Sequence, residues 1–195
     1  MASGPPRHMS GTFVAVVGPS GAGKDSLIGF ARDRLEASGR VVFVRRVVTR
    51  AADGGSEDHD SMDTIAFAAA ERDGAFALSW DAHGLRYGLP IGLENDLAAG
   101  RVVVANLSRA QIPGLLQRYP NAVVVAVTAD IEVIAKRLAN RGRETADSIQ
   151  LRLSRSVVDR LPTSTVRIDN SGSLEVAGTQ FVRLLQDAAG LVERV

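Results

Sequence analysis

The stretch that decides the fold is GPSGAGKDS at residues 18–26, directly after the apolar run TFVAVV at residues 12–17. It comprises Gly18, Pro19, Ser20, Gly21, Ala22, Gly23, Lys24, Asp25 and Ser26. The apolar run has the pattern of a buried strand, and residues 25–37 have the apolar spacing of a helix. A GxxxxGK sequence between a strand and a helix is typical of a phosphate-binding loop, where backbone N–H groups and a lysine ammonium surround phosphate oxygens. We therefore predict that residues 18–26 bind the phosphates of a nucleotide.

The residue after Lys24 departs from the usual loop. That position commonly carries a Ser or Thr whose hydroxyl binds Mg²⁺, whereas here Asp25 is followed by Ser26. Asp25 can bind magnesium directly or through a water, since carboxylates suit a hard cation. Alternatively, Asp25 stabilises the first turn of the helix and Ser26 lies near the metal. Both interpretations predict ATP and Mg²⁺ as cofactors.

Apolar runs alternate with segments of helical spacing along the rest of the chain. Strands are predicted at residues 12–18, 41–47, 75–80, 101–106, 122–128 and 166–168, with a further short strand after the turn at 84–88. Helices are predicted at residues 25–37, 64–72, 91–99, 109–118, 130–140, 148–160 and 174–188, and residues 50–63 read as a polar loop. This alternation predicts an α/β fold with a parallel sheet flanked by helices on both faces.

Composition limits the remaining choices. The 195 residues carry a net charge of +1, which gives no reason to expect nucleic acid or an acidic membrane as partner. Cysteine is absent, which excludes disulfides and thiol chemistry and fits a cytoplasmic location. The longest apolar runs have the length of strands and are too short to cross a bilayer. Residues 1–10 are expected to form a flexible leader, and residues 11–195 a single domain.

Several later segments, taken with the loop, resemble the guanylate kinase superfamily over about residues 12–188. Val48-Thr49-Arg50 resembles the TTR segment of that family, whose arginine holds the acceptor phosphate, and Glu57-Asp58-His59 falls on its Gly-x-Asp-Tyr run. Residues 76–80 (FALSW) and 83–88 (HGLRYG) resemble its F-x-E-W and G-x-x-Y-G segments. Arg137-Leu138 and Arg141-Gly142 resemble its lid, Arg152 lies in the helix that follows, and Asn170 matches an asparagine near the adenine.

The departures from that family concern the acceptor base. Its guanine-reading glutamate is Ser79 here, the serine after Tyr-Gly is Leu89, and its second acceptor-phosphate arginine falls at about Asp53. The paired aspartates after the middle strand become Asn106 and Ser108. Guanine recognition depends on such polar partners, whereas the phosphate-holding residues Arg50 and Tyr87 remain. The pocket is therefore predicted to hold a phosphate without reading guanine.

This combination of motifs is similar to the ribose 1,5-bisphosphate phosphokinase family of phosphonate catabolism. The resemblance implies ATP-dependent conversion of ribose 1,5-bisphosphate to 5-phospho-α-D-ribose 1-diphosphate (PRPP). It also implies a P-loop kinase fold with a small acceptor-binding insertion at about residues 48–90 and a lid at about 141–147. The identity of the sugar rests on the resemblance alone.

An acceptor phosphate is already anionic at neutral pH, so the reaction needs cations more than a general base. The predicted catalytic residues are Lys24, Arg141 and Arg152, the two arginines clamping the transferred group. The predicted substrate contacts are Arg50, Asp58, His59, Ser79, Tyr87, Asn106 and Ser108, and Asn170 is assigned to the nucleotide.

Three other functions remain open on the sequence. The first is a nucleoside monophosphate kinase with altered base preference, which Ser79 and Leu89 disfavour. The second is a non-catalytic guanylate-kinase-like domain that binds phosphopeptides, which the intact loop disfavours. The third is a kinase acting on a hydroxyl group, for which Asp58 is the one candidate base.

Overall fold

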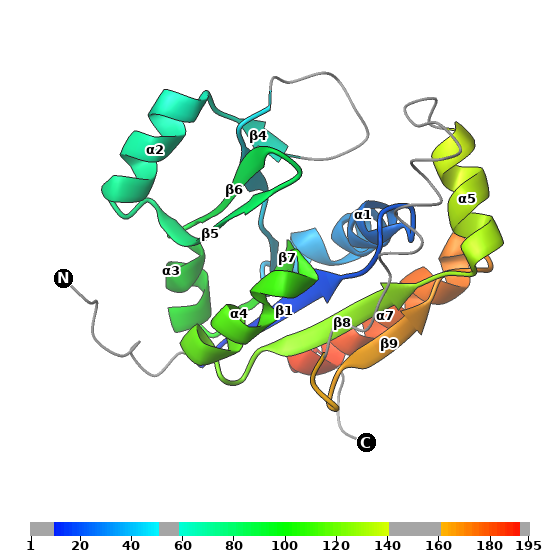
Figure 1. Ribbon diagram of the computed structural model, residues 1–195. Helices are drawn as coiled ribbons and strands as arrows, with labels where there is room; N and C mark the ends of the chain where they lie inside the picture. The colour runs from blue at the N-terminus through cyan, green and yellow to red at the C-terminus, as the bar shows by residue number, and fades with distance from the viewer. Residues whose placement is uncertain (1–9, 51–58, 141–160, 192–195) are drawn as a thin grey trace.

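The central element is β1 (Thr12–Val17), which lies in the middle of a five-stranded parallel sheet (Figure 1). The structure is a computed structural model and describes residues 10–50, 59–140 and 161–191. The strand order is β2-β7-β1-β8-β9, where β2 is Val41–Phe43, β7 is Val102–Asn106, β8 is Val123–Thr128 and β9 is Val166–Asp169. All four strand pairings are parallel. The carboxyl ends of the strands therefore meet at one edge, where α/β proteins bind ligands.

Alternate residues of β1 face two different helix layers. Val14 and Val16 pack in one apolar cluster with α1 (Lys24–Leu35) and α7 (Leu174–Ala188). Phe13, Ala15 and Val17 pack in a second cluster with α3 (Leu93–Ala98) and α4 (Ile112–Arg118). Because side chains alternate across a strand, a strand that is apolar throughout must be covered on both faces. Helix α5 (Ile131–Asn140) follows β8, and 3₁₀ turns lie at Glu36–Ser38 and Arg109–Gln111.

A second sheet is formed by the chain between β2 and α3. Its order is β4-β3-β6-β5, with β3 at Arg46–Val48, β4 at His59–Ser61, β5 at Phe76–Ala82 and β6 at Leu85–Pro90. Helix α2 (Thr64–Arg72) begins at Asp63, whose carboxylate accepts hydrogen bonds from the N–H groups of Ile65 and Ala66. The helix packs on this sheet through Phe67, which stacks on Phe76 with 4.6 Å between ring centroids.

Two sequence-based expectations differ from the structure. The single strand expected at residues 41–47 is two strands, β2 and β3, which belong to different sheets. The polar loop expected at 50–63 contains β4, which pairs with β3 in parallel. The predicted α/β fold, with a parallel sheet flanked by helices, is confirmed, whereas the helix expected at 148–160 and the lid at 141–147 lie outside the described residues. Among the helices of the described ranges, none is both long and apolar enough to cross a membrane.

Candidate active site

The phosphate loop connects the carboxyl end of β1 to the first turn of α1. Gly23 precedes the helix in the left-handed region, at φ 91°, and a Cβ there would lie 2.3 Å from Nδ2 of Asn170. Gly18 has φ 151°, and a Cβ there would lie 2.3 Å from the carbonyl oxygen of Val127. Both positions therefore require glycine because of conformation and because of space. The loop packs tightly between β8, α5 and the end of β9.

The side chain of Lys24 folds back onto the phosphate loop. Its ammonium donates hydrogen bonds to the carbonyl oxygens of Gly18 at 2.9 Å and Pro19 at 3.0 Å. These contacts hold the positive charge at the loop, beside the N-terminus of α1. An ammonium and a helix N-terminus at the same place form a site suited to phosphate oxygens.

Two buried asparagines form hydrogen bonds with the phosphate loop and the first turn of α1. Asn106 and Asn170 are the buried polar side chains among the described residues, 7% and 2% exposed. Asn170 Nδ2 donates to the carbonyl oxygen of Ala22 at 2.7 Å, while its side-chain oxygen is buried with no hydrogen-bond partner among the described residues. Such an unsatisfied acceptor is costly unless a ligand or water supplies a donor. Asn170 therefore serves as a loop contact and also offers one free acceptor.

Asn106 contacts the other side of the loop. Its Nδ2 donates to Oδ1 of Asp25 at 2.8 Å. The parallel register places Asn106 opposite Val16, one residue before the loop-bearing strand ends, so β7 delivers the amide to the first turn of α1. Ser26 is exposed, whereas Asp25 is half-buried in this contact. The pair brings a carboxylate and an amide together at the phosphate loop.

Sequence reasoning did not select Arg137, although its place in a family motif was noted. From α5 its guanidinium donates to the carbonyl oxygen of Asn170 at 2.9 Å and to that of Ala22 at 3.4 Å. The signal was available in the Arg137-Leu138 pair, but 21 arginines (23 Lys and Arg less the two lysines, Lys24 and Lys136) make any single one hard to single out.

The predicted acceptor residues lie on the second sheet. Tyr87 stacks on Trp80 with 5.5 Å between centroids and 8° between ring planes, so its ring is fixed in orientation. Thr49, next to Arg50, bonds to Arg86 in both directions: its N–H donates to the carbonyl oxygen of Arg86 at 3.0 Å and its hydroxyl accepts the N–H of Arg86 at 2.8 Å. Arg50 therefore lies two residues after β3, and β3 pairs with the strand that carries Tyr87.

Ser79 forms a hydrogen bond with a residue of α2. Its hydroxyl donates to Oε1 of Glu71 at 2.6 Å, and Oε2 of Glu71 forms an ion pair with Arg86. The hydrogen bond from Ser79, followed by the contact with Arg86, lowers the pKa of Glu71 below its ordinary value in spite of partial desolvation. Leu89, at the other position that differs from guanylate kinases, is fully buried in the second apolar cluster.

The remaining predicted residues are Asp58, His59, Ser108, Arg141 and Arg152. Asp58, Arg141 and Arg152 lie outside the described residues. His59 begins β4 and Ser108 follows β7 by two residues. Over the part of the chain that is described, no group of three or more His, Cys, Asp or Glu side chains could hold a metal independently of a nucleotide.

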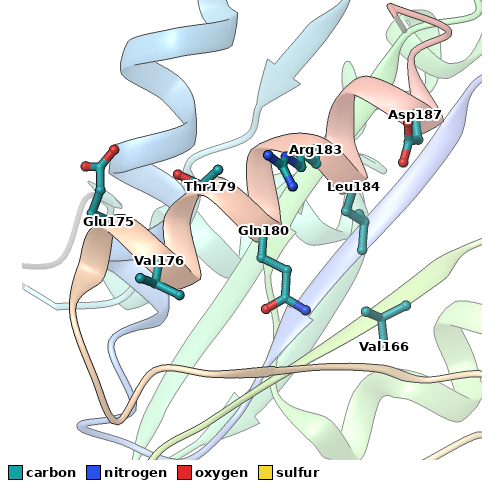
Figure 2. Close-up of a pocket in the computed structure, with 8 residues that line it drawn as sticks. All are labelled: Val166, Glu175, Val176, Thr179, Gln180, Arg183, Leu184 and Asp187. Carbon is teal, nitrogen blue, oxygen red and sulfur yellow. The ribbon is translucent and has the colours of Figure 1, made fainter.

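The structure also contains a hollow that is lined by residues of α7 and by Val166 of β9. The hollow has a volume of about 680 Å³. Figure 2 shows the side chains that line it. Its lining residues are Val166, Glu175, Val176, Thr179, Gln180, Arg183, Leu184 and Asp187. None of the predicted site residues is among them, so we place the candidate site at the phosphate loop on chemical grounds.

Comparison with known proteins gives several related sequences. The chain is 50% identical over 181 residues to a ribose 1,5-bisphosphate phosphokinase PhnN of Chelativorans sp., covering 92% of this chain and 87% of the relative. It is 48% identical over 180 residues to the protein of the same name from Brucella melitensis, covering 92% and 94%. A Burkholderia pseudomallei protein, again of that name, is 48% identical over 179 residues and covers 91% and 96%. No protein-family model matches the chain.

Solved structures show the same fold at low identity. A guanylate kinase from Anaplasma phagocytophilum superposes with a TM-score of 0.65 at 17% identity, covering 91% of this chain and 85% of that one. A gluconokinase from Sinorhizobium meliloti superposes with a TM-score of 0.52 at 20% identity, covering 95% and 97%. These likenesses establish the kinase fold.

Proposed function

Because the chain belongs to the ribose 1,5-bisphosphate phosphokinase family, we propose that it transfers the γ-phosphoryl group of ATP to ribose 1,5-bisphosphate, forming PRPP and ADP. The observation that carries the proposal is identity of 48–50% over about nine-tenths of the chain with relatives of that name, joined to an intact phosphate loop. A direct displacement between two phosphates needs positioning and positive charge, which this site supplies.

The donor half of the site fits ATP. Lys24 and the N-terminus of α1 stand where the β- and γ-phosphates would bind, and Lys24 would exchange its two loop carbonyls for phosphate oxygens. The buried side-chain oxygen of Asn170 fits a donor such as the exocyclic amine of adenine. Arg141 and Arg152 stay proposed clamps of the transferred group.

Magnesium fits the pair formed by Asp25 and Asn106. A carboxylate held at 2.8 Å from an amide, at the start of the helix that follows the phosphate loop, offers the oxygen ligands that this cation prefers. When bound, the cation would neutralise charge on the ATP phosphates. Two observations favour Asp25 over Ser26 as the metal ligand. Asp25 is held at the phosphate loop by Asn106, whereas Ser26 is exposed on the helix surface.

The acceptor half supports a sugar phosphate over a nucleotide. Ser79 is hydrogen-bonded to Glu71 and Leu89 is buried, so neither side chain is arranged to read a base. Arg50 follows β3 by two residues and Tyr87 lies on β6, which pairs with β3, so both residues that match the phosphate-holding positions are near this sheet. A phosphate site without a base reader fits a compact phosphorylated sugar.

The test compares acceptors with the purified protein and Mg·ATP. We expect kcat/KM for ribose 1,5-bisphosphate to exceed that for GMP, AMP, UMP and CMP, with ADP release measured by a coupled assay and PRPP identified by mass. A higher kcat/KM for GMP would show that the protein is a nucleoside monophosphate kinase. Failure to bind Mg·ATP would favour a non-catalytic domain.

The metal ligand is tested with Asp25→Asn and, as the matched control, Ser26→Ala. Asp25→Asn keeps the shape of the side chain and removes the charge, so we expect weaker binding of Mn²⁺ to the ATP complex by electron paramagnetic resonance and a higher magnesium requirement. Ser26→Ala should alter neither. The reverse result would place the metal near Ser26, and no change in either variant would leave Asp25 as a helix-stabilising residue.

A further inference from the structure

Arg46 lies where the chain passes from one sheet to the other. Strand β2 pairs with β7 up to Phe43 opposite Val104, and the N–H of Val44 still donates to the carbonyl oxygen of Val104 at 2.9 Å. Two residues later Arg46 begins β3 of the second sheet. Because β2 and β7 are parallel, this crossing occurs at the same edge of the core sheet at which β7 ends with Asn106. Arg46 is thus placed between the donor and acceptor halves of the site.

Arg46 also shares a face of the second sheet with Tyr87, one of the predicted phosphate residues. Val48 is paired directly with Tyr87, and side chains two residues apart on a strand point to the same side. The guanidinium carbon of Arg46 lies 5.7 Å from the centroid of the Tyr87 ring, which confirms this orientation. Trp80 fixes that ring from the neighbouring strand. The guanidinium is therefore held beside the aromatic ring at a half-buried position.

The proposed substrate carries two phosphates, and both need positive charge because they repel each other and the phosphates of ATP. The second arginine of guanylate kinases falls at about Asp53 here, so that source of charge is missing from the sequence. We propose that Arg46 binds one phosphate of the sugar bisphosphate while Arg50 binds the other. This inference rests on the proposed function. A guanidinium fork suits the task because it bonds two phosphate oxygens at once.

Arg45 provides a matched control one residue away. Its guanidinium donates to the carbonyl oxygen of His59 at 3.0 Å and forms an ion pair with Asp60 at 3.1 Å. Half of its side chain is exposed, and alternation along the chain directs it away from the Tyr87 face. Removing Arg45 therefore deletes the same charge from almost the same place in the sequence without touching the proposed phosphate contact.

The experiment measures steady-state kinetics and calorimetric binding for Arg46→Gln, Arg46→Lys and Arg45→Gln. Arg46→Gln should raise KM for ribose 1,5-bisphosphate by about 10- to 100-fold, the range for loss of a charged hydrogen-bonding partner, and leave KM for ATP near that of the wild type. Arg46→Lys should recover part of the loss because it keeps the charge without the fork. Arg45→Gln should change KM for the sugar far less than Arg46→Gln does.

Two one-phosphate probes, ribose 1-phosphate and ribose 5-phosphate, identify the contact. Arg46→Gln should weaken binding of one probe and spare the other. Equal weakening of both would mean that Arg46 acts only as a general charge, and behaviour like Arg45→Gln would remove it from the site; either result overturns the inference. If Arg46→Gln does not fold, Arg46→Lys is tested against the same probes. Absence of wild-type turnover with ribose 1,5-bisphosphate would instead overturn the proposed function.

Discussion

Gly23→Ala should damage the phosphate loop more than its small size suggests. The residue has φ 91°, a conformation that costs an alanine about 1–2 kcal/mol. The added Cβ would stand 2.3 Å from Nδ2 of Asn170, so the asparagine must move and lose its 2.7 Å bond to the carbonyl oxygen of Ala22. Breaking that bond at a side chain that is 2% exposed costs about 1–3 kcal/mol more. We expect a loss of about 2–5 kcal/mol in the free energy of unfolding.

The control is Gly29→Ala, six residues further along α1. A Cβ at Gly29 meets nothing within 4 Å, and alanine is the better helix former by about 0.5–1 kcal/mol. Urea unfolding of both variants and of the wild type gives the comparison, with Mg·ATP affinity measured in parallel. Gly29→Ala should unfold at a higher urea concentration and bind ATP normally. If Gly23→Ala unfolds together with the wild type, the close contact between the loop and Asn170 is not what holds the loop.

Three further predictions concern charge at the site. Lys24→Ala should lower kcat by about 10²–10³-fold or more with little change in the urea midpoint, and near-normal turnover would contradict a role for the loop in catalysis. Glu71 has a pKa below its ordinary value of 4.5, so its ionised form stabilises the fold; this stabilisation is complete above pH 4.5 and is lost as the pH falls through the lowered pKa. The stability difference between wild type and Glu71→Gln should therefore vanish on acidification, and a difference that persists in acid would refute the ion pair. Ser79→Glu with Leu89→Ser, which copies guanylate kinases, should destabilise the protein instead of creating GMP kinase activity, because it sets a second carboxylate beside Glu71 and a hydroxyl in the core. Robust GMP turnover by a stable double variant would show that the base pocket is intact.

Helices with a clear start could be predicted from the sequence almost to the residue. Helices α2 and α7 have the expected bounds, because Asp63 and Ser173 accept hydrogen bonds from the first turns and mark where each helix begins. The phosphate loop was equally accessible, since all its determinants lie within nine consecutive residues, 18–26.

The passage between sheets could not be predicted. Residues 41–48 read VVFVRRVV, and no glycine or proline marks the point at which β2 ends and β3 begins. Strand β4 is polar, and only backbone pairing with β3 defines it. A strand defined by its neighbour leaves little trace in its own side chains.

Contacts between distant segments were likewise hidden from the sequence. Ser79 could be read from the sequence as a position without a carboxylate, but its hydrogen bond to Glu71 of α2, which also pairs with Arg86, became visible only with the fold. Similarly, Asn170 was assigned to the nucleotide from its resemblance, and its bond to Ala22 became visible only with the fold. Such contacts depend on how elements pack, which local patterns do not encode.

The bond between Ala22 and Asn170 has a consequence for biosynthesis. It joins residues 148 positions apart, and the strand that carries the loop, β1, pairs with β7 and β8. During translation the loop therefore leaves the ribosome early, while the strands and the asparagine that shape it arrive much later. Folding that depends on such distant pairing is slow to begin, because a long loop of chain must close first. We expect a ribosome-bound chain to acquire nucleotide affinity only after β9 and Asn170 have emerged.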